Sequence, residues 1–281
     1  MERAVPAQHL GNGLAAPGNA LGDTGNGLSP GLQVVDVHNR EACLAQLTGQ
    51  LRPLGVHCDS PLGYQHINAG PGGGDTGDPV GDDGQPGTDF TVGLMPEAQF
   101  CGGGEESIQG VFYNPNIPTE ECFTSPKRGL AEGIVYATKP LSYQGQLIEG
   151  FSIRFAGGKA VEVHAEKNEE LLKTMISMDE GAAYLGECAL VPQSSPIAQC
   201  GYLFYNTLFD ENAACHLALG MGYADTIRDF QNKTLEECRS YGINDSMIHE
   251  DFMIGCDSMN IDAHTRDGRV VPIFRNGNWA F

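Results

Sequence analysis

Basic side chains are scarce in this chain. Its 281 residues hold 16 lysines and arginines against 36 acids, which gives a formal net charge of −20. Nucleic-acid backbones and anionic lipid surfaces are bound through basic patches, so this balance argues against both kinds of partner. No apolar run approaches the roughly 18 residues that a membrane-spanning helix needs. We therefore expect no nucleic acid and no membrane among the partners.

Several well-known motifs are also missing. The sequence contains no H-E-x-x-H helix, no G-x-S-x-G turn and no P-loop, and the glycines within residues 70–74 lack the Lys-Ser/Thr of a phosphate cradle. The nine cysteines include no C-x-x-C pair. An odd cysteine count in a chain too long to need disulfides favours reduced thiols, and hence a cytoplasmic location.

Large side chains are rare in the first 86 residues. This segment holds 17 glycines and 8 prolines, a single tyrosine, and no lysine, phenylalanine or tryptophan. Such a composition cannot bury enough area to offset the entropy lost on ordering. Residues 70–87 have the composition of a flexible acidic linker, and only residues 32–56 have the apolar density for a strand and a short helix. We expect 1–86 to be poorly ordered or truncated, and 87–281 to form the functional domain.

From residue 89 onward, alternating apolar residues predict hairpins. Residues 151–155 and 161–165 alternate on either side of Gly157-Gly158, which is typical of two strands joined by a tight turn. Turn pairs at 267–268 and 276–277 predict two more hairpins near the C-terminus.

Helical spacing predicts two helices. One is expected to start after an N-cap at Asn168 and to end at Gly181. The other is expected over residues 213–219, because acids suited to a helix N-terminus precede it. Strands and helices are mixed without a βαβ rhythm, so the predicted class is α+β with a mixed sheet rather than a doubly wound sheet.

A histidine and an aspartate form the clearest candidate site. They lie within residues 247–254, an otherwise apolar run that predicts a strand. On a strand, residues i and i+2 point to the same face, so His249 and Asp251 would present an imidazole and a carboxylate side by side. Glu250 would point away. This pair is suited to metal coordination.

Two further ionisable residues lie in apolar settings. Glu187 follows a run of small and apolar residues, where a carboxylate must be paired, protonated or bound to a cation. A salt-bridged Glu at a strand edge and a hydrogen-bonded core histidine at His216 are the plainer interpretations. If residues 213–223 were one helix, His216 and Tyr223 would share a face. Because lysine is scarce, clustered carboxylates here need cations from solution.

Several motifs point further, to a known family. They are Asn116-Ile117-Pro118-Thr119-Glu120-Glu121, Phe123-Thr124-Ser125-Pro126, Asp179-Glu180-Gly181-Ala182, Gly186-Glu187-Cys188-Ala189-Leu190-Val191, Ser195-Pro196-Ile197, the run from Tyr205 to Ala213, and Phe274-Arg275-Asn276-Gly277-Asn278-Trp279. Through them, residues 88–281 closely resemble the aminopeptidase T / aminopeptidase S / PepS family of metallopeptidases. Members of that family carry a longer N-terminal region, and residues 1–86 resemble nothing in it.

The resemblance implies a function and a ligand set. Family members are cytoplasmic, homodimeric exopeptidases that use two divalent cations to remove N-terminal residues from peptides with a free N-terminus. The implied catalytic residue is Tyr223, and the implied metal ligands are Glu121, Glu187, Glu211, His216, His249 and Asp251. Oxygen and imidazole ligands together leave Zn, Co, Mn and Mg open as the metal.

The resemblance also suggests roles, and alternatives stand beside it. Glu187 is the expected bridge between the two metals, Tyr223 the expected donor to the oxyanion, and Glu120 a candidate general base or amine anchor. One competing interpretation is a metal-binding module that keeps the ligands without turnover. A glycosidase with two carboxylates would explain the acids but neither His216 nor His249.

Overall fold

The computed structural model of the chain describes residues 65–70, 87–102, 104–113, 120–265 and 268–281. The elements predicted within residues 32–56 lie outside these ranges, as do residues 71–86 of the linker predicted at 70–87. Residues 65–70 form a strand that the composition of the first 86 residues did not predict.

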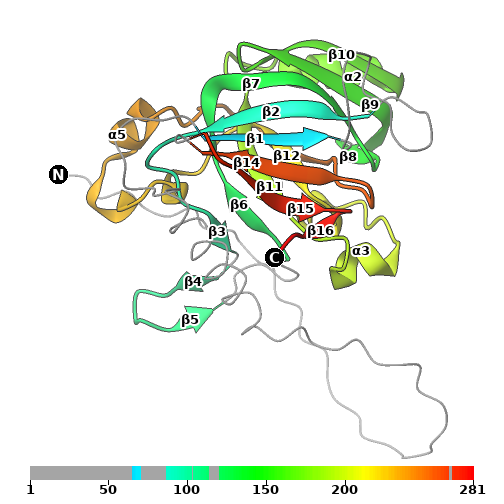
Figure 1. Cartoon of the computed structure of the whole chain (residues 1–281). Coiled ribbons are helices and arrows are strands. Elements are labelled where there is room, and N and C mark those ends of the chain that lie inside the picture. The colour runs from blue at the N-terminus through cyan, green and yellow to red at the C-terminus, as the bar shows by residue number, and fades with distance from the viewer. Residues whose placement is uncertain (1–64, 71–86, 103, 114–119, 266–267) are drawn as a thin grey trace, which may run out of the picture. The chain divides into compact units, whose positions relative to one another are not determined.

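Two antiparallel sheets make up the framework. The larger has nine strands, in the order β10-β9-β7-β2-β1-β14-β15-β16 with β8 paired to β9 (Figure 1). Its strands are β1 (Gln65–Gly70), β2 (Asp89–Leu94), β7 (Pro126–Tyr136), β8 (Leu141–Tyr143), β9 (Gln146–Ala156), β10 (Lys159–Lys167), β14 (Asn260–His264), β15 (Val270–Arg275) and β16 (Asn278–Trp279).

The smaller sheet has five strands, in the order β13-β12-β11-β6-β3. They are β3 (Cys101–Gly102), β6 (Cys122–Thr124), β11 (Leu185–Leu190), β12 (His216–Gly220) and β13 (His249–Met253). A separate hairpin pairs β4 (Glu105–Glu106) with β5 (Phe112–Tyr113). Because Ser125 alone separates β6 from β7, the chain passes from the smaller sheet into the larger one at that residue.

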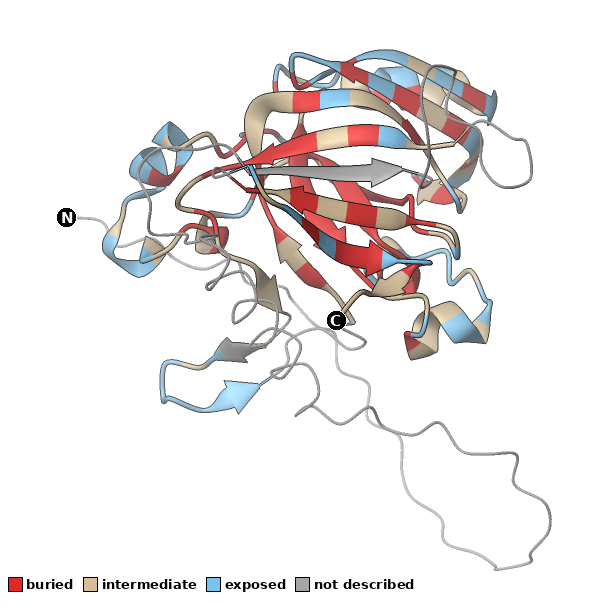
Figure 2. Cartoon of the chain, viewed as in Figure 1, coloured by how far each residue is buried: buried red, intermediate tan, exposed pale blue. Residues whose placement is uncertain are grey.

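The two sheets share one hydrophobic core. Phe90 and Val92 of β2 line the same internal cavity, of about 20 Å³, as Leu190 of β11 and Leu217 of β12. Figure 2 shows buried positions running along the strands of both sheets. The predicted α+β class is confirmed, with short helices between the strands. The predicted mixed sheet is wrong, because all strand pairs among the described residues are antiparallel, as hairpin connections between neighbouring strands favour.

The predicted hairpins are confirmed, with one irregularity. β9 and β10 flank Gly157-Gly158, β14 pairs with β15, and β15 and β16 flank a turn at Asn276-Gly277. The turn predicted at 267–268 lies partly outside the described residues. The pairing of β9 with β10 shifts by one residue between Ala160 and Glu162. This bulge turns Val161 outward, where it is 55% exposed, because the inserted residue interrupts the alternation.

The first predicted helix forms as α2 (Glu169–Ile176), but its ends differ from the prediction. Asn168 precedes it in a left-handed conformation, and its side-chain amide donates to the Leu147 carbonyl instead of capping the helix. The helix ends at Ile176, five residues before Gly181. Gly181 instead allows a close approach, since a Cβ there would lie 1.8 Å from the Asp245 carbonyl oxygen.

The helix predicted over 213–219 is wrong, because His216–Gly220 is strand β12. All five residues are buried in the middle of the smaller sheet, and a short apolar run buried on both faces cannot be assigned to helix or strand from periodicity. The remaining helices are α3 (Pro196–Cys200), α4 (Thr207–Asp210), α5 (Leu235–Ser240) and the 3₁₀ turns η1 (Glu211–Ala213), η2 (Ala224–Thr226) and η3 (Phe230–Asn232). No helix among the described residues is long and apolar enough to cross a membrane.

Candidate metal centre

Strand β13 places His249 and Asp251 on one face, as its alternation predicts. The Nε2 atom of His249 lies 3.4 Å from Oδ1 of Asp251. Glu250, between them, belongs to none of the clusters of potential metal ligands in the described residues. Burial raises the pKa of Glu250 to about 6.

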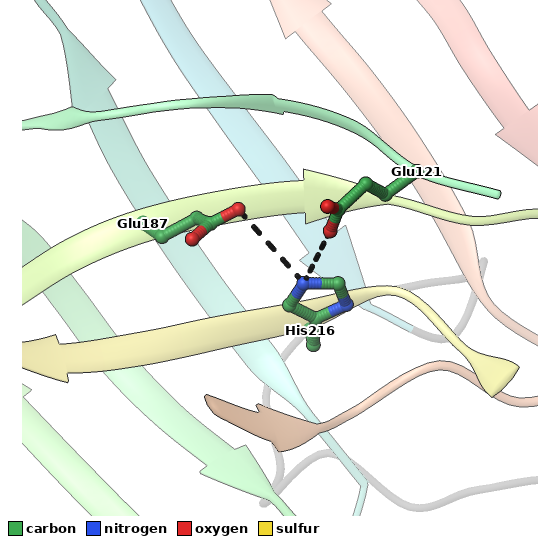
Figure 3. Close-up of side chains that lie close together, drawn as sticks. All are labelled: Glu121, Glu187 and His216. Atoms are coloured by element: carbon green, nitrogen blue, oxygen red, sulfur yellow. Dashed lines mark ion pairs between the residues drawn. The ribbon is translucent and has the colours of Figure 1, made fainter. Parts of the chain in front are cut away.

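Strand pairing brings residues from distant parts of the chain to the same place. Glu187 of β11 pairs with Ala218 of β12, which in turn pairs with Asp251 of β13. His216 begins β12, and its Nε2 lies 3.1 Å from Glu121 Oε2 and 3.9 Å from Glu187 Oε1. Figure 3 shows both carboxylates directed at this imidazole.

Glu187 also faces the second histidine. Its Oε2 atom lies 3.1 Å from His249 Nε2, so the two oxygens of this carboxylate face different imidazoles. Glu211, on the 3₁₀ turn before β12, completes the cluster. Potential ligand atoms lie within 4.8 Å of one another in three overlapping groups: Glu121, Glu187 and His216; Glu187, His249 and Asp251; and Glu211, His216 and Asp251.

Both histidines are held by backbone carbonyls. The Nδ1 atom of His216 lies 3.0 Å from the Ala214 oxygen, and that of His249 lies 2.7 Å from the Met221 oxygen. Each contact requires the proton on Nδ1, because a carbonyl only accepts. The lone pair of a neutral ring is then on Nε2, directed at the carboxylates, which is how metal-binding histidines are commonly oriented.

The cluster holds four carboxylates and only two imidazoles, so its acids outnumber the groups that can carry positive charge. Burial raises the pKa of Glu187 to about 7 and that of Glu211 to about 10, with nearby carboxylates adding to the effect. Burial lowers the pKa of the two histidines, but hydrogen bonds and charge from the carboxylates outweigh it and raise their pKa to about 10 at His216 and about 11 at His249. Without a cation, the cluster is therefore neutralised by protons.

The donor atoms fit a cation. Glu121 Oε2, His216 Nε2 and Asp251 Oδ1 are buried and have no hydrogen-bond partner of good geometry within the described residues. Buried polar atoms are nearly always satisfied, and these three are directed into one cluster. Carboxylate oxygens and imidazole nitrogens are ligands that divalent ions such as Zn²⁺ and Mn²⁺ accept.

Tyr223 lies beside this cluster. Its ring packs against the His249 imidazole, with centroids 4.7 Å apart, and edge-to-face against Phe123 at 5.8 Å. Burial and the surrounding carboxylates raise the pKa of its hydroxyl, which therefore stays a hydrogen-bond donor. Although the predicted helix is wrong, Tyr223 and His216 are still brought to the same site.

Two nearby polar residues, both within the run from Tyr205 to Ala213 that carries the family resemblance, have structural roles. Asp210 accepts from the backbone N–H groups of Phe204 and Asn206, so it holds a loop instead of joining the cluster. Asn212 is fully buried, and its Oδ1 accepts from the backbone N–H of Glu120. It thereby ties the segment before β6 to η1, which no local sequence pattern indicates.

Comparison with known proteins gives a consistent result. Residues 83–279 match the family described as thermophilic metalloprotease (M29). The chain is 50% identical over 195 residues to "Aminopeptidase AmpS" of Bacillus subtilis, covering 69% of this chain and 48% of that protein. It is 50% identical over 194 residues to "Aminopeptidase T" of Thermus aquaticus, covering 69% and 47%.

A solved structure is also similar. "Wild-type AmpT from Thermus thermophilus" matches with a TM-score of 0.70 at 38% identity, over 87% of this chain and 56% of that one. The chain thus spans about half the length of the curated relatives it matches.

Proposed function

Because this chain belongs to the thermophilic metalloprotease (M29) family, we propose that it is a metallo-aminopeptidase, which hydrolyses the N-terminal peptide bond of peptides with a free N-terminus. Relatives at about 50% identity are named as aminopeptidases, which supports this activity. The observation that carries the proposal is Glu187, whose two carboxylate oxygens face the imidazoles of His216 and His249.

The proposed ligands are the six clustered residues Glu121, Glu187, Glu211, His216, His249 and Asp251. We propose that they hold two divalent ions, with Glu187 shared between them. Bound there, such ions supply Lewis-acid polarisation of the scissile carbonyl and lower the pKa of an attacking water. Zn, Co, Mn and Mg all suit this donor set.

The chain's own residues have distinct tasks in this proposal. The buried carboxylates present negative charge to the cationic amine of a peptide N-terminus. The Tyr223 hydroxyl donates a hydrogen bond to the oxygen on which negative charge develops as the carbonyl is attacked. Glu120 adjoins the cluster through its neighbour Glu121 and is a candidate general base or amine anchor.

Two expectations about context belong to the same proposal. We propose a cytoplasmic location, and the seven cysteines that the structure describes are all free thiols, in keeping with reduced surroundings. A homodimer is proposed from the family resemblance. The competing interpretation, a module that binds metal without turnover, has no observation in its favour.

Metal content and hydrolysis measured on the same sample test the proposal. We expect about two ions per chain, and release of p-nitroaniline from amino-acid p-nitroanilides with added Zn, Co, Mn or Mg. A chelator should abolish this release, and N-acetylated substrates should stay intact because their amine is blocked. Bound metal without turnover would contradict the proposed activity, and no bound metal would contradict the proposed ligand set.

A further inference from the structure

Ser125 lies where the chain leaves the smaller sheet and enters the larger one, and it is fully buried. Its hydroxyl contacts the backbone of Tyr223, 98 residues later in the chain. The Tyr223 N–H donates to Ser125 Oγ at 2.8 Å, and the Ser125 hydroxyl donates to the Tyr223 carbonyl at 3.4 Å. One side chain therefore contacts both backbone polar groups of Tyr223.

The bond to the N–H is the critical one. The Tyr223 carbonyl has a second and shorter contact, since the Thr226 hydroxyl donates to it at 2.6 Å. For the Tyr223 N–H, the acceptor found among the described residues is Ser125 Oγ. Removing that oxygen would leave a backbone donor unsatisfied, and such a donor favours movement of the backbone toward another partner or water.

Gly222 makes this contact possible. A Cβ at this position would lie 2.9 Å from Cγ2 of Ile243 and 3.2 Å from Ser125 Oγ. A larger residue would therefore push the Tyr223 backbone away from the serine. Gly222 therefore leaves the space in which the Ser125 hydroxyl reaches the Tyr223 N–H.

The same short segment carries other contacts with the candidate site. Glu121 precedes β6, and Phe123 within β6 packs edge-to-face against the Tyr223 ring, which in turn packs against His249. Ser125 ends this segment. Residues 121–125 thus contribute a carboxylate of the cluster, a ring contact and a backbone anchor within five consecutive residues.

We propose that Ser125 is a positioning residue that fixes Tyr223 against His249 by holding the backbone N–H of Tyr223. This inference rests on the proposed function in one respect only, namely that the Tyr223 hydroxyl acts in the reaction. The position of Tyr223 itself can be tested without any turnover.

The first test is amide hydrogen exchange at Tyr223, measured by NMR on the full chain. In Ser125→Ala we expect exchange at this amide to be at least about tenfold faster than in the wild type, because its acceptor is gone. The control is Thr265→Val, which removes another buried hydroxyl, in the hairpin between β14 and β15, and should leave this amide unchanged. Unchanged exchange in Ser125→Ala would overturn the proposal. If Ser125→Ala does not fold, Ser125→Cys takes its place, since a thiol is a poorer acceptor.

The second test uses a double-mutant cycle. Ser125→Ala should lower kcat by about tenfold to 100-fold, with KM and metal content unchanged, because a small displacement of a reacting group has effects of this size. In a Tyr223→Phe background the same change should cause no further loss. Equal losses in both backgrounds would overturn the proposal in favour of a general structural role.

The two proposals can fail separately. If the wild-type chain loaded with metal hydrolyses no peptide substrate, that result counts against the proposed function. Hydrogen exchange at Tyr223 would still decide whether Ser125 holds that residue in place.

Discussion

The two sheets use burial in opposite ways. In the nine-stranded sheet, residues 151–156 of β9 alternate between buried and half-buried or exposed positions, as expected for a sheet with one face toward the core and one toward water. In the five-stranded sheet, all six residues of β11 and all five of β12 are buried. Yet this second sheet is the one in which acids and histidines are buried, namely Glu187, His216 and Asp251.

Among the residues whose burial the structure describes, every buried acid or histidine lies in the five-stranded sheet or within residues 207–213, just before β12. Burying charge is unfavourable unless it is paired or binds a metal. The nine-stranded sheet therefore supplies stability through apolar packing, whereas the five-stranded sheet keeps groups that cost stability. Such a contrast is typical of a functional site built on a rigid scaffold.

The largest effect is expected from neutralising Glu187, the carboxylate that faces both histidines. We expect Glu187→Gln to lower peptide hydrolysis by more than about 1,000-fold and to reduce the bound metal. Removing a residue that only hydrogen-bonds to a metal ligand already lowers metal affinity or activity by roughly 10- to 100-fold, and losing a ligand itself should cost more. Activity and metal content per chain are the measurements.

Glu250→Gln is the matched control for that variant. It removes a carboxylate from the same sheet, next to Asp251 but outside the ligand clusters. Hydrolysis should stay within about threefold of the wild type, as is usual for a change that touches no special contact. Similar losses in both variants would mean that the site responds to total charge and not to Glu187 itself.

The second prediction addresses the other sheet. Phe155 is 1% exposed in β9 and packs against Phe90, with ring centroids 5.4 Å apart. Phe155→Ala should lower the free energy of unfolding by about 3–5 kcal/mol, through lost apolar burial and the cavity left behind. Denaturant titration measures this loss, and metal content of the folded fraction should not change. A variant that loses metal before it loses stability would show that the two sheets do not divide these roles.

Local patterns predicted much of this arrangement. The hairpins followed from alternation around glycine turns, and the shared face of His249 and Asp251 followed from the pleat of one strand. Both depend on residues close in sequence, where geometry is fixed by the backbone alone.

Other features depended on pairing between distant strands. β12 was predicted as a helix because a short, wholly buried run has no periodicity to read. The meeting of Glu121, Glu187 and His216 requires β6, β11 and β12 to be neighbours, which no local spacing specifies. Ser125 and Asn212 lie in motifs that carry the family resemblance, but their partners Tyr223 and Glu120 are 98 and 92 residues away in the chain, so no local spacing indicates these contacts.

The third prediction concerns the cation itself. A ligand that binds only the folded chain stabilises it by about 2.7 kcal/mol at 100 times its dissociation constant. Adding a suitable divalent ion to metal-free protein should therefore raise the unfolding temperature of the wild type, and raise it much less in Glu187→Gln. An equal rise in both would place the binding outside this cluster.

The smallest expected effect is a dependence of stability on pH that only the metal-free chain shows. The raised pKa of Glu187, about 7, means that its contribution to stability is full below its ordinary pKa of 4.5 and is lost as the pH rises through 7. The raised pKa values of His216 and His249 likewise make the stability fall as the pH rises, over a higher pH range. The unfolding temperature of the metal-free protein should therefore fall steadily, by a few degrees, as the pH rises from 5 to about 8.5. Saturating cation should flatten this slope because it replaces the protons, and a slope unchanged by cation would show that the titrating groups lie elsewhere in the molecule.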